Sequence, residues 1–301
     1  MRYSGADSSI YEPASVRGIS SRRSEHRPQV RAARRTPASL SVPSTPRRSE
    51  AYDRAMRVLV LQHIACEPPG VFEDVLHERG AELHRVELDE GQALPEWRDV
   101  DAIVAMGGPM SVNDDAELPW LTAEKRAIGE AVRARTPYWG VCLGVQLLAA
   151  SLDALVYPGP EPEVGLLPVQ ITAAGRDDPV FAGLADDLVT LQWHGDTFDL
   201  PHGSTLLASS PAYANQAFRF ERAYGVQFHL EVSPEMAREW AAVPEYVASL
   251  ERTLGAEGAP AFLASIAERA EEMRAAGRAL FERWLDRVVA QERVLDASSR
   301  V

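Results

Sequence analysis

Residues 138–146 read Tyr-Trp-Gly-Val-Cys-Leu-Gly-Val-Gln and join a short apolar strand to a helix. The strand is predicted at 138–141 and the helix from Val145 to Leu152. Between them lies Gly-x-Cys-x-Gly, which has the form of a nucleophile elbow with Cys142 at its strained centre. A helix N-terminus beneath the sulfur favours the thiolate, so the pattern predicts a cysteine nucleophile. The alternative is a small buried cysteine that merely precedes a helix.

On both sides of this stretch, short apolar runs alternate with amphipathic segments. Strands are predicted at 57–62, 83–88 and 101–106, and helices at 71–78 and 122–134. Such alternation predicts an α/β fold with a doubly wound, mostly parallel sheet and helices on both faces. Further strands are predicted at 164–171, 188–193, 205–209, 216–220 and 224–228. The chain becomes helical from Pro234, with a long final helix at about 260–291.

Three regions of different composition divide the chain. Residues 1–55 are rich in Arg, Ser and Pro and show no apolar period, which predicts a disordered leader. Its acidic residues argue against an organelle transit peptide, so a dispensable tail or a start codon assigned too early fits better. Residues 56–240 form the predicted α/β domain. Residues 241–301 form a helical extension with apolar residues at near-helical spacing, expected to pack on the domain or on a partner chain.

Composition limits the kinds of function. The formal net charge of −13 argues against a nucleic-acid surface, because phosphate binding depends on Lys and Arg. No apolar run approaches the roughly 20 residues that cross a bilayer, and the N-terminus lacks the apolar core of a secretory signal. A cytoplasmic protein without a membrane partner is therefore expected. The two cysteines are expected as reduced thiols; Cys66 lacks an elbow and is predicted to lie at a pocket edge, with a catalytic role as the alternative.

A glycine pair follows the predicted strand at 101–106. Glycines at the carboxyl end of a strand let a backbone N–H point into the crevice where α/β sheets bind ligands. Together with the elbow, Gly107-Gly108 predicts an oxyanion hole formed by the backbone N–H groups of Gly108 and Leu143. An ordinary Gly-Pro turn is the alternative.

A third motif ends the last predicted strand, where residues 224–231 read Tyr-Gly-Val-Gln-Phe-His-Leu-Glu. His229 can serve as the base, and Glu231 can hold its imidazole in one tautomer, completing a triad with Cys142. A single histidine at a strand end is more often structural. The order Cys, His, Glu at two separate strand ends is much harder to obtain by accident.

In combination, these motifs resemble the class I glutamine amidotransferase family over about residues 56–235. The family's triad is a Cys in Gly-x-Cys-x-Gly and a His-x-Glu near the end of the domain; it often has Pro where this chain has Leu230, a residue that does no chemistry. The resemblance implies that Cys142 attacks the γ-carbonyl of glutamine, forming a γ-glutamyl thioester. It implies that His229 passes the proton to the leaving ammonia and then activates water.

The resemblance also implies that Gln146 and Gln216 hold the amino-acid end of the substrate, and that no metal or organic cofactor is required. The segment at 193–198, Trp-His-Gly-Asp-Thr-Phe, resembles a loop of the small stand-alone members and of the glutaminase part of GMP synthetase. His194 and Asp196 do not complete a metal shell, so a role in supporting this loop is preferred.

Three functions stay open at this point. The first is a glutamine amidotransferase that supplies ammonia to a synthetase partner, since no room remains in this chain for the synthetase domain of the larger members. The second is a free-standing γ-glutamyl hydrolase that acts on small peptides or amines. The third is a non-catalytic ligand-binding relative, against which the intact Cys142, His229 and Glu231 argue.

Overall fold

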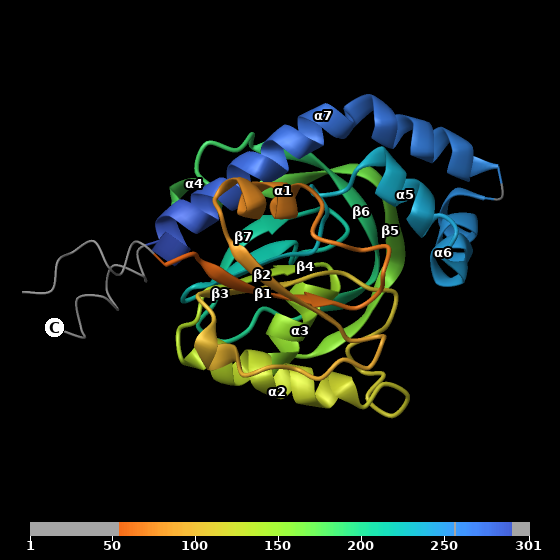
Figure 1. Ribbon diagram of the computed structural model, residues 1–301. Helices are drawn as coiled ribbons and strands as arrows, with labels where there is room; N and C mark the ends of the chain where they lie inside the picture. The colour runs from red at the N-terminus through yellow and green to blue at the C-terminus, as the bar shows by residue number, and fades with distance from the viewer. Residues whose placement is uncertain (1–53, 256, 291–301) are drawn as a thin grey trace, which may run out of the picture. The chain divides into compact units, whose positions relative to one another are not determined.

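The computed structural model describes residues 54–255 and 257–290. The predicted disordered leader therefore lies outside the described residues, apart from its last two positions. The described chain is built around one large sheet with helices on both of its faces (Figure 1). Within the described ranges, no helix is long and apolar enough to cross a membrane.

Among the described residues, the strands form a nine-stranded sheet in the order β2-β1-β3-β4-β9-β8-β7-β5-β6. The first five in this order are parallel: β2 (Glu82–Glu87), β1 (Arg57–Gln62), β3 (Ala102–Ala105), β4 (Tyr138–Val141) and β9 (Ala223–Val226). The others pair antiparallel: β8 (Ala217–Phe220), β7 (Thr205–Ser209), β5 (Val156–Ile171) and β6 (Asp187–Phe198). The α/β fold is confirmed, with the parallel order confined to one half of the sheet.

Helices cover both faces of the parallel half (Figure 1). One face carries α1 (Val71–Glu78) and α7 (Gly258–Trp284), and the other α2 (Trp120–Arg133) and α3 (Leu143–Ser151). The side chains of β1 alternate between the two cores: Val58 and Val60 pack in the first, whereas Leu59 and Leu61 pack in the second. A strand that is buried on both faces requires a continuous apolar run, and this run is the signal from which the strand at 57–62 was predicted. Shorter elements are η1 (Trp97–Asp99) and α4 (Ala173–Asp177).

The C-terminal part of the described chain consists of α5 (Pro234–Trp240), α6 (Pro244–Leu254), α7 and a π-helical turn at Leu285–Val289. The ring of Phe281 on α7 stacks on that of Phe72 on α1, with centroids 4.7 Å apart. The Trp284 ring lies 5.6 Å from that of Trp139 on β4. The described part of the extension therefore packs on the α/β domain.

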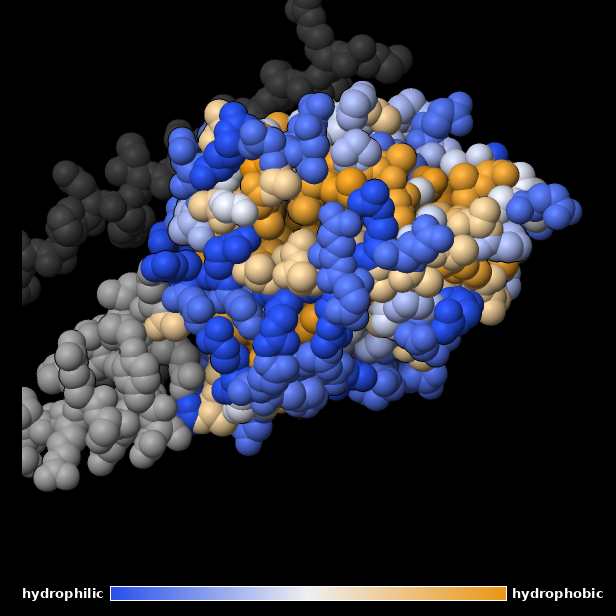
Figure 2. Space-filling view, turned by 90° about the horizontal axis from the view of Figure 1, so that it is seen from above, coloured by the Kyte–Doolittle hydropathy of each residue, from blue (hydrophilic) through white to orange (hydrophobic). Residues whose placement is uncertain are grey.

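The outer surface of this layer mixes hydrophilic and hydrophobic residues, as Figure 2 shows for the side that α7 covers in Figure 1. Two ion pairs join this layer to α1. Arg274 on α7 pairs with Asp74 on α1, and Asp286 in the π-helical turn pairs with Arg79 at the end of α1. Exposed pairs of this kind contribute little energy, so the buried aromatic contacts are the main attachment of the extension.

Strand β5 begins earlier than predicted, at Val156 instead of near residue 164. Three prolines lie between 158 and 162, and proline disfavours a strand because it cannot donate to a β-ladder. The pairing of β5 with β6 shifts register between Pro158 and Glu163, so the prolines lie in an irregular part of the ladder. The final helix also differs, since its last turn is π-helical rather than α-helical.

Candidate active site

Cys142 lies at the junction of β4 and α3. Its backbone has φ 52° and ψ −106°, a region that residues with a side chain rarely occupy. Two glycines make this turn feasible: a Cβ on Gly140 would lie 2.6 Å from the carbonyl oxygen of Gly144, and a Cβ on Gly144 would overlap the carbonyl oxygen of Ala105. The predicted nucleophile elbow is therefore present in the backbone.

His229 and Glu231 follow β9, the neighbour of β4 in the sheet. The Nδ1 atom of His229 lies 2.6 Å from Oε1 of Glu231, and both side chains are buried. The backbone N–H of Leu230 donates to Oε2 of Glu231 at 3.0 Å, which fixes the carboxylate. A β-bridge to Leu191 holds the His229 backbone, and the ring of Trp240 lies 4.9 Å from the imidazole. The imidazole is thus fixed in orientation from several sides.

The second ring nitrogen of His229, Nε2, has no hydrogen-bond partner within the described ranges. Burial lowers the pKa of His229, but the Glu231 carboxylate and the Cys142 sulfur outweigh burial and raise it well above the ordinary 6.5. These two neighbours therefore favour the imidazolium form of the ring. This is the form that can protonate a leaving amine.

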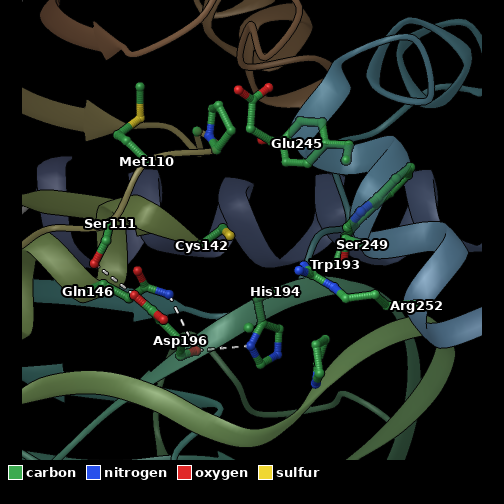
Figure 3. Close-up of a pocket in the computed structure, with 15 residues that line it drawn as sticks. Met110, Ser111, Cys142, Gln146, Trp193, His194, Asp196, Glu245, Ser249 and Arg252 are labelled. Atoms are coloured by element: carbon green, nitrogen blue, oxygen red, sulfur yellow. Dashed lines mark hydrogen bonds between the residues drawn. The ribbon is translucent and has the colours of Figure 1, made fainter. Parts of the chain in front are cut away.

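A chain of amides runs from the sulfur to the wall of the cavity. The Nε2 atom of Gln227 lies 3.6 Å from Sγ of Cys142, and its Oε1 accepts a 3.1 Å hydrogen bond from Gln146. Gln146 also donates to the backbone carbonyl of Asp196 at 3.5 Å (Figure 3). Sequence reasoning gave no role to Gln227. Its position two residues before His229 is the signal that could have found it, because such side chains share a face of an extended chain.

Both predicted oxyanion donors lie beside Cys142. A Cβ on Gly108 would lie 3.1 Å from Cδ2 of Leu143, and a Cβ on Gly107 would lie 3.5 Å from Cβ of Cys142. The backbone N–H groups of Gly108 and Leu143 have no hydrogen-bond partner in the part of the chain that the structure describes. They are available to bind a developing oxyanion.

A second buried histidine–carboxylate pair holds the glycine loop. Nδ1 of His63 lies 3.2 Å from the carbonyl oxygen of Gly107, and Nε2 of His63 lies 2.9 Å from Oε1 of Glu124. Burial lowers the pKa of His63, but Glu124 and the Gly107 carbonyl outweigh burial and raise it. Both ring nitrogens face acceptor oxygens, which favours the doubly protonated ring. The carbonyl of Gly107 and the N–H of Gly108 belong to one planar peptide. Holding the carbonyl therefore sets the direction of the Gly108 N–H.

The sulfur of Cys142 faces a cavity of about 250 Å³ (Figure 3). Its lining includes Gly108, Gln146, His194 and Asp196 from the sheet side, and part of α6 from the opposite side. Figure 3 shows Gln146, His194 and Asp196 together along one wall, joined by hydrogen bonds. The cavity thus combines a nucleophile with polar groups for a small polar substrate.

Gln216 does not reach this cavity, which corrects the expectation that it holds the substrate. Its Nε2 donates to Oε2 of Glu163 at 2.7 Å, and its Oε1 accepts from Gln192 at 3.4 Å. Glu163 lies in turn 3.2 Å from Nε2 of His194, whose Nδ1 faces the Asp196 carbonyl at 3.1 Å. Gln216 therefore supports the cavity wall from behind. In the described ranges, no group of three His, Cys, Asp or Glu side chains could hold a metal ion.

Cys66 lies outside the cavity lining and is half-buried. Burial, followed by the neighbouring Glu67 carboxylate, raises the pKa of its thiol to about 11. At neutral pH this group is a protonated thiol, which is a poor nucleophile. Its carbonyl oxygen accepts a 2.7 Å hydrogen bond from the indole of Trp240, the residue that packs on His229.

Comparison with known proteins places the chain in one family. The family model described as Glutamine amidotransferase class-I matches residues 71–240. The glutamine amidotransferase-like protein YfeJ of Salmonella typhimurium is 34% identical over 185 residues, which cover 60% of this chain and 77% of YfeJ. The glutamine-hydrolysing GMP synthase subunit of Sulfurisphaera tokodaii is 34% identical over 138 residues, which cover 45% of this chain and 69% of that protein.

Solved structures agree with the sequence comparison. A glutamine amidotransferase from Thermotoga maritima has a TM-score of 0.70 at 31% identity and covers 77% of this chain and 99% of its own. A glutamine amido transferase from Methylobacillus flagellatus has a TM-score of 0.69, also at 31% identity, and covers 77% and 95%. The resemblance seen in the sequence motifs is confirmed: the chain belongs to the class-I glutamine amidotransferase family.

Proposed function

We propose that this protein hydrolyses the side-chain amide of glutamine to glutamate and ammonia, with Cys142 as nucleophile, His229 as acid and base, and Glu231 as the orienting acid. The observation that carries the proposal is the state of the His229 ring. Its Nδ1 lies 2.6 Å from Oε1 of Glu231, its Nε2 has no hydrogen-bond partner among the described residues, and the Cys142 sulfur contributes to the raised pKa of the ring. This arrangement supports nucleophilic catalysis by sulfur.

The reaction follows from these positions. The Cys142 sulfur, having given its proton to His229, attacks the γ-carbonyl carbon, and the N–H groups of Gly108 and Leu143 bind the resulting oxyanion. The tetrahedral adduct breaks its C–N bond, and His229 transfers its proton to the nitrogen, so ammonia leaves a γ-glutamyl thioester. His229 then takes a proton from water as the water attacks the thioester. The C–S bond breaks, and glutamate leaves with the free enzyme restored.

A synthetase partner that consumes the ammonia is part of this proposal. The support comes from the similarity to the Sulfurisphaera tokodaii protein, whose name describes one subunit of a glutamine-hydrolysing GMP synthase. The second candidate substrate is a γ-glutamyl peptide or amine. The observation that favours it is the polar wall that α6 adds to the cavity, which offers contacts to a leaving group larger than ammonia.

We expect the purified protein to release glutamate and ammonia from L-glutamine in equal amounts. γ-Glutamyl methylamide, γ-glutamylglycine and glutathione should be assayed beside it, with glutamate measured in every case. Cleavage of the γ-glutamyl peptides with no cleavage of glutamine would select the second candidate. Absence of glutamate from all four compounds would refute a hydrolytic function.

We expect Glu124→Gln to lower kcat by about 10-fold while KM changes little. The neutral amide no longer holds His63 in the doubly protonated form, so the Gly107–Gly108 peptide loses its fixed direction. Oxyanion contacts form only as the transition state develops, which confines the loss to kcat. Steady-state kinetics would measure it, with Glu130→Gln, an exposed change on the same helix, as the control. An unchanged kcat, or a loss seen only in KM, would contradict the role of this pair.

A further inference from the structure

Helix α6 forms one wall of the active-site cavity although it lies beyond residues 71–240, the segment that the family model matches. The lining residues that it supplies are Glu245, Tyr246, Ser249 and Arg252. Figure 3 shows Glu245, Ser249 and Arg252 across the cavity from Gln146 and Asp196, with Arg252 extending from α6 toward the cavity. The chemistry of this wall is therefore a property of the C-terminal extension rather than of the matched segment.

This wall is firmly held. The hydroxyl of Tyr246 donates a hydrogen bond to Glu67, a buried carboxylate that lies against Gly107 of the oxyanion loop. The Tyr246 ring lies 5.4 Å from that of Trp193 and 5.9 Å from that of Trp240. The polar side chains of α6 are thus presented from a fixed position, which lowers the entropic cost of binding a ligand.

Arg252 is the one Lys or Arg among the described residues that line the cavity. It is exposed, and it has no hydrogen bond or ion pair with any residue that the structure describes. The other basic group in the lining, His194, is already engaged by Glu163 and Gln192. The remaining charged residues of the lining, Asp196 and Glu245, are acidic. An unpartnered guanidinium directed into a cavity is suited to bind an anion from solution.

We propose that Arg252 binds a carboxylate of the substrate and so determines specificity at this site. The inference rests on the proposed function, because every γ-glutamyl substrate carries an α-carboxylate and an α-ammonium group. Asp196 and Glu245 offer the negative charge that the ammonium group requires, and Arg252 offers the positive charge that the carboxylate requires. If the substrate is a γ-glutamyl amino acid, a second carboxylate lies on the leaving group, and Arg252 binds that one instead.

Binding to the Cys142→Ala variant by isothermal titration calorimetry tests this directly, since no turnover intervenes. L-Glutamine and L-glutaminamide differ only in whether the α-group is a charged carboxylate or a neutral amide. If Arg252 binds the α-carboxylate, adding Arg252→Met should weaken the binding of glutamine by about 10- to 100-fold, the usual range for losing a hydrogen bond to a charged group, and leave the binding of glutaminamide nearly unchanged. Arg252→Lys should restore part of the affinity. Arg238→Met, on an exposed residue of α5 paired with Glu235, is the matched control.

A second pair of ligands identifies which carboxylate is bound. γ-Glutamylglycine and γ-glutamyl methylamide share the α-carboxylate, but the leaving group of the first alone carries another. If Arg252→Met weakens the binding of both ligands equally, Arg252 binds the α-carboxylate. If it weakens the binding of γ-glutamylglycine alone, Arg252 binds the carboxylate of the leaving group. The proposal is overturned if Arg252→Met leaves the binding of all four ligands unchanged, or if it weakens the binding of glutaminamide as much as that of glutamine. Failure of Cys142→Ala to bind any of them also overturns it, whereas the proposed hydrolysis is judged separately by glutamate release from the wild-type protein.

Discussion

Cys142→Ala is expected to lower kcat for glutamine hydrolysis by about four orders of magnitude or more, because the described residues that line the cavity include no other cysteine to form the thioester. Cys66→Ala is expected to retain most of the activity. The thiol of Cys66 has its pKa raised to about 11, first by burial, and it lies outside the cavity lining. Initial rates of glutamate release from the two variants give the comparison.

Each substitution removes one sulfur atom and leaves only a small cavity, so the two variants serve as controls for each other. Their melting temperatures should show that each variant folds. An inactive Cys66→Ala beside an active Cys142→Ala would move the nucleophile to Cys66, and the elbow would then have to be a structural turn.

His229→Ala is expected to lower kcat by about three orders of magnitude or more, since it removes the group that accepts and returns the proton. Glu231→Gln should lower kcat by a smaller factor, and it should also shift the pH dependence of kcat/KM. Glu231 raises the pKa of His229, so its neutralisation lowers that pKa. The alkaline limb of kcat/KM, where the imidazolium loses its proton, should therefore shift to lower pH. Measuring kcat/KM against pH for the wild type and for Glu231→Gln tests the direction of this shift.

A structural role for this pair would give a different pattern. If Glu231→Gln lowered the melting temperature and left the alkaline limb in place, Glu231 would be holding the loop without tuning the imidazole. Wild-type activity in His229→Ala would remove the histidine from the mechanism altogether.

The elbow and the parallel strands were predictable because their signals are local. Only small residues fit at 140 and 144, and a doubly buried strand needs an unbroken apolar run. The juxtaposition of Cys142 and His229 also follows from sequence, because both come at the carboxyl ends of strands in one sheet. The structure makes these strands neighbours, and the N–H of Cys142 donates to the carbonyl of Val226 at 2.9 Å.

The groups that sequence reasoning missed are joined over long distances. His63 and Glu124 are 61 positions apart, and Glu67 and Tyr246 are 179 apart, so no periodicity links either pair. The prediction that Gln216 holds the substrate was wrong for a related reason. Its sequence neighbourhood fits a substrate-binding amide, but its side chain is turned to Glu163, a partner on another strand. Side-chain direction at a strand end depends on the register with the neighbouring strand, which the sequence does not display.

The most direct test of the central claim is to find the atom that carries the acyl group. The protein should be mixed with radiolabelled glutamine, quenched in acid within the first turnover, digested and mapped by mass spectrometry. A γ-glutamyl label on the peptide that contains Cys142, absent from Cys142→Ala, is the predicted result. Label on the Cys66 peptide, or hydrolysis of glutamine with no label on either cysteine, would contradict the account.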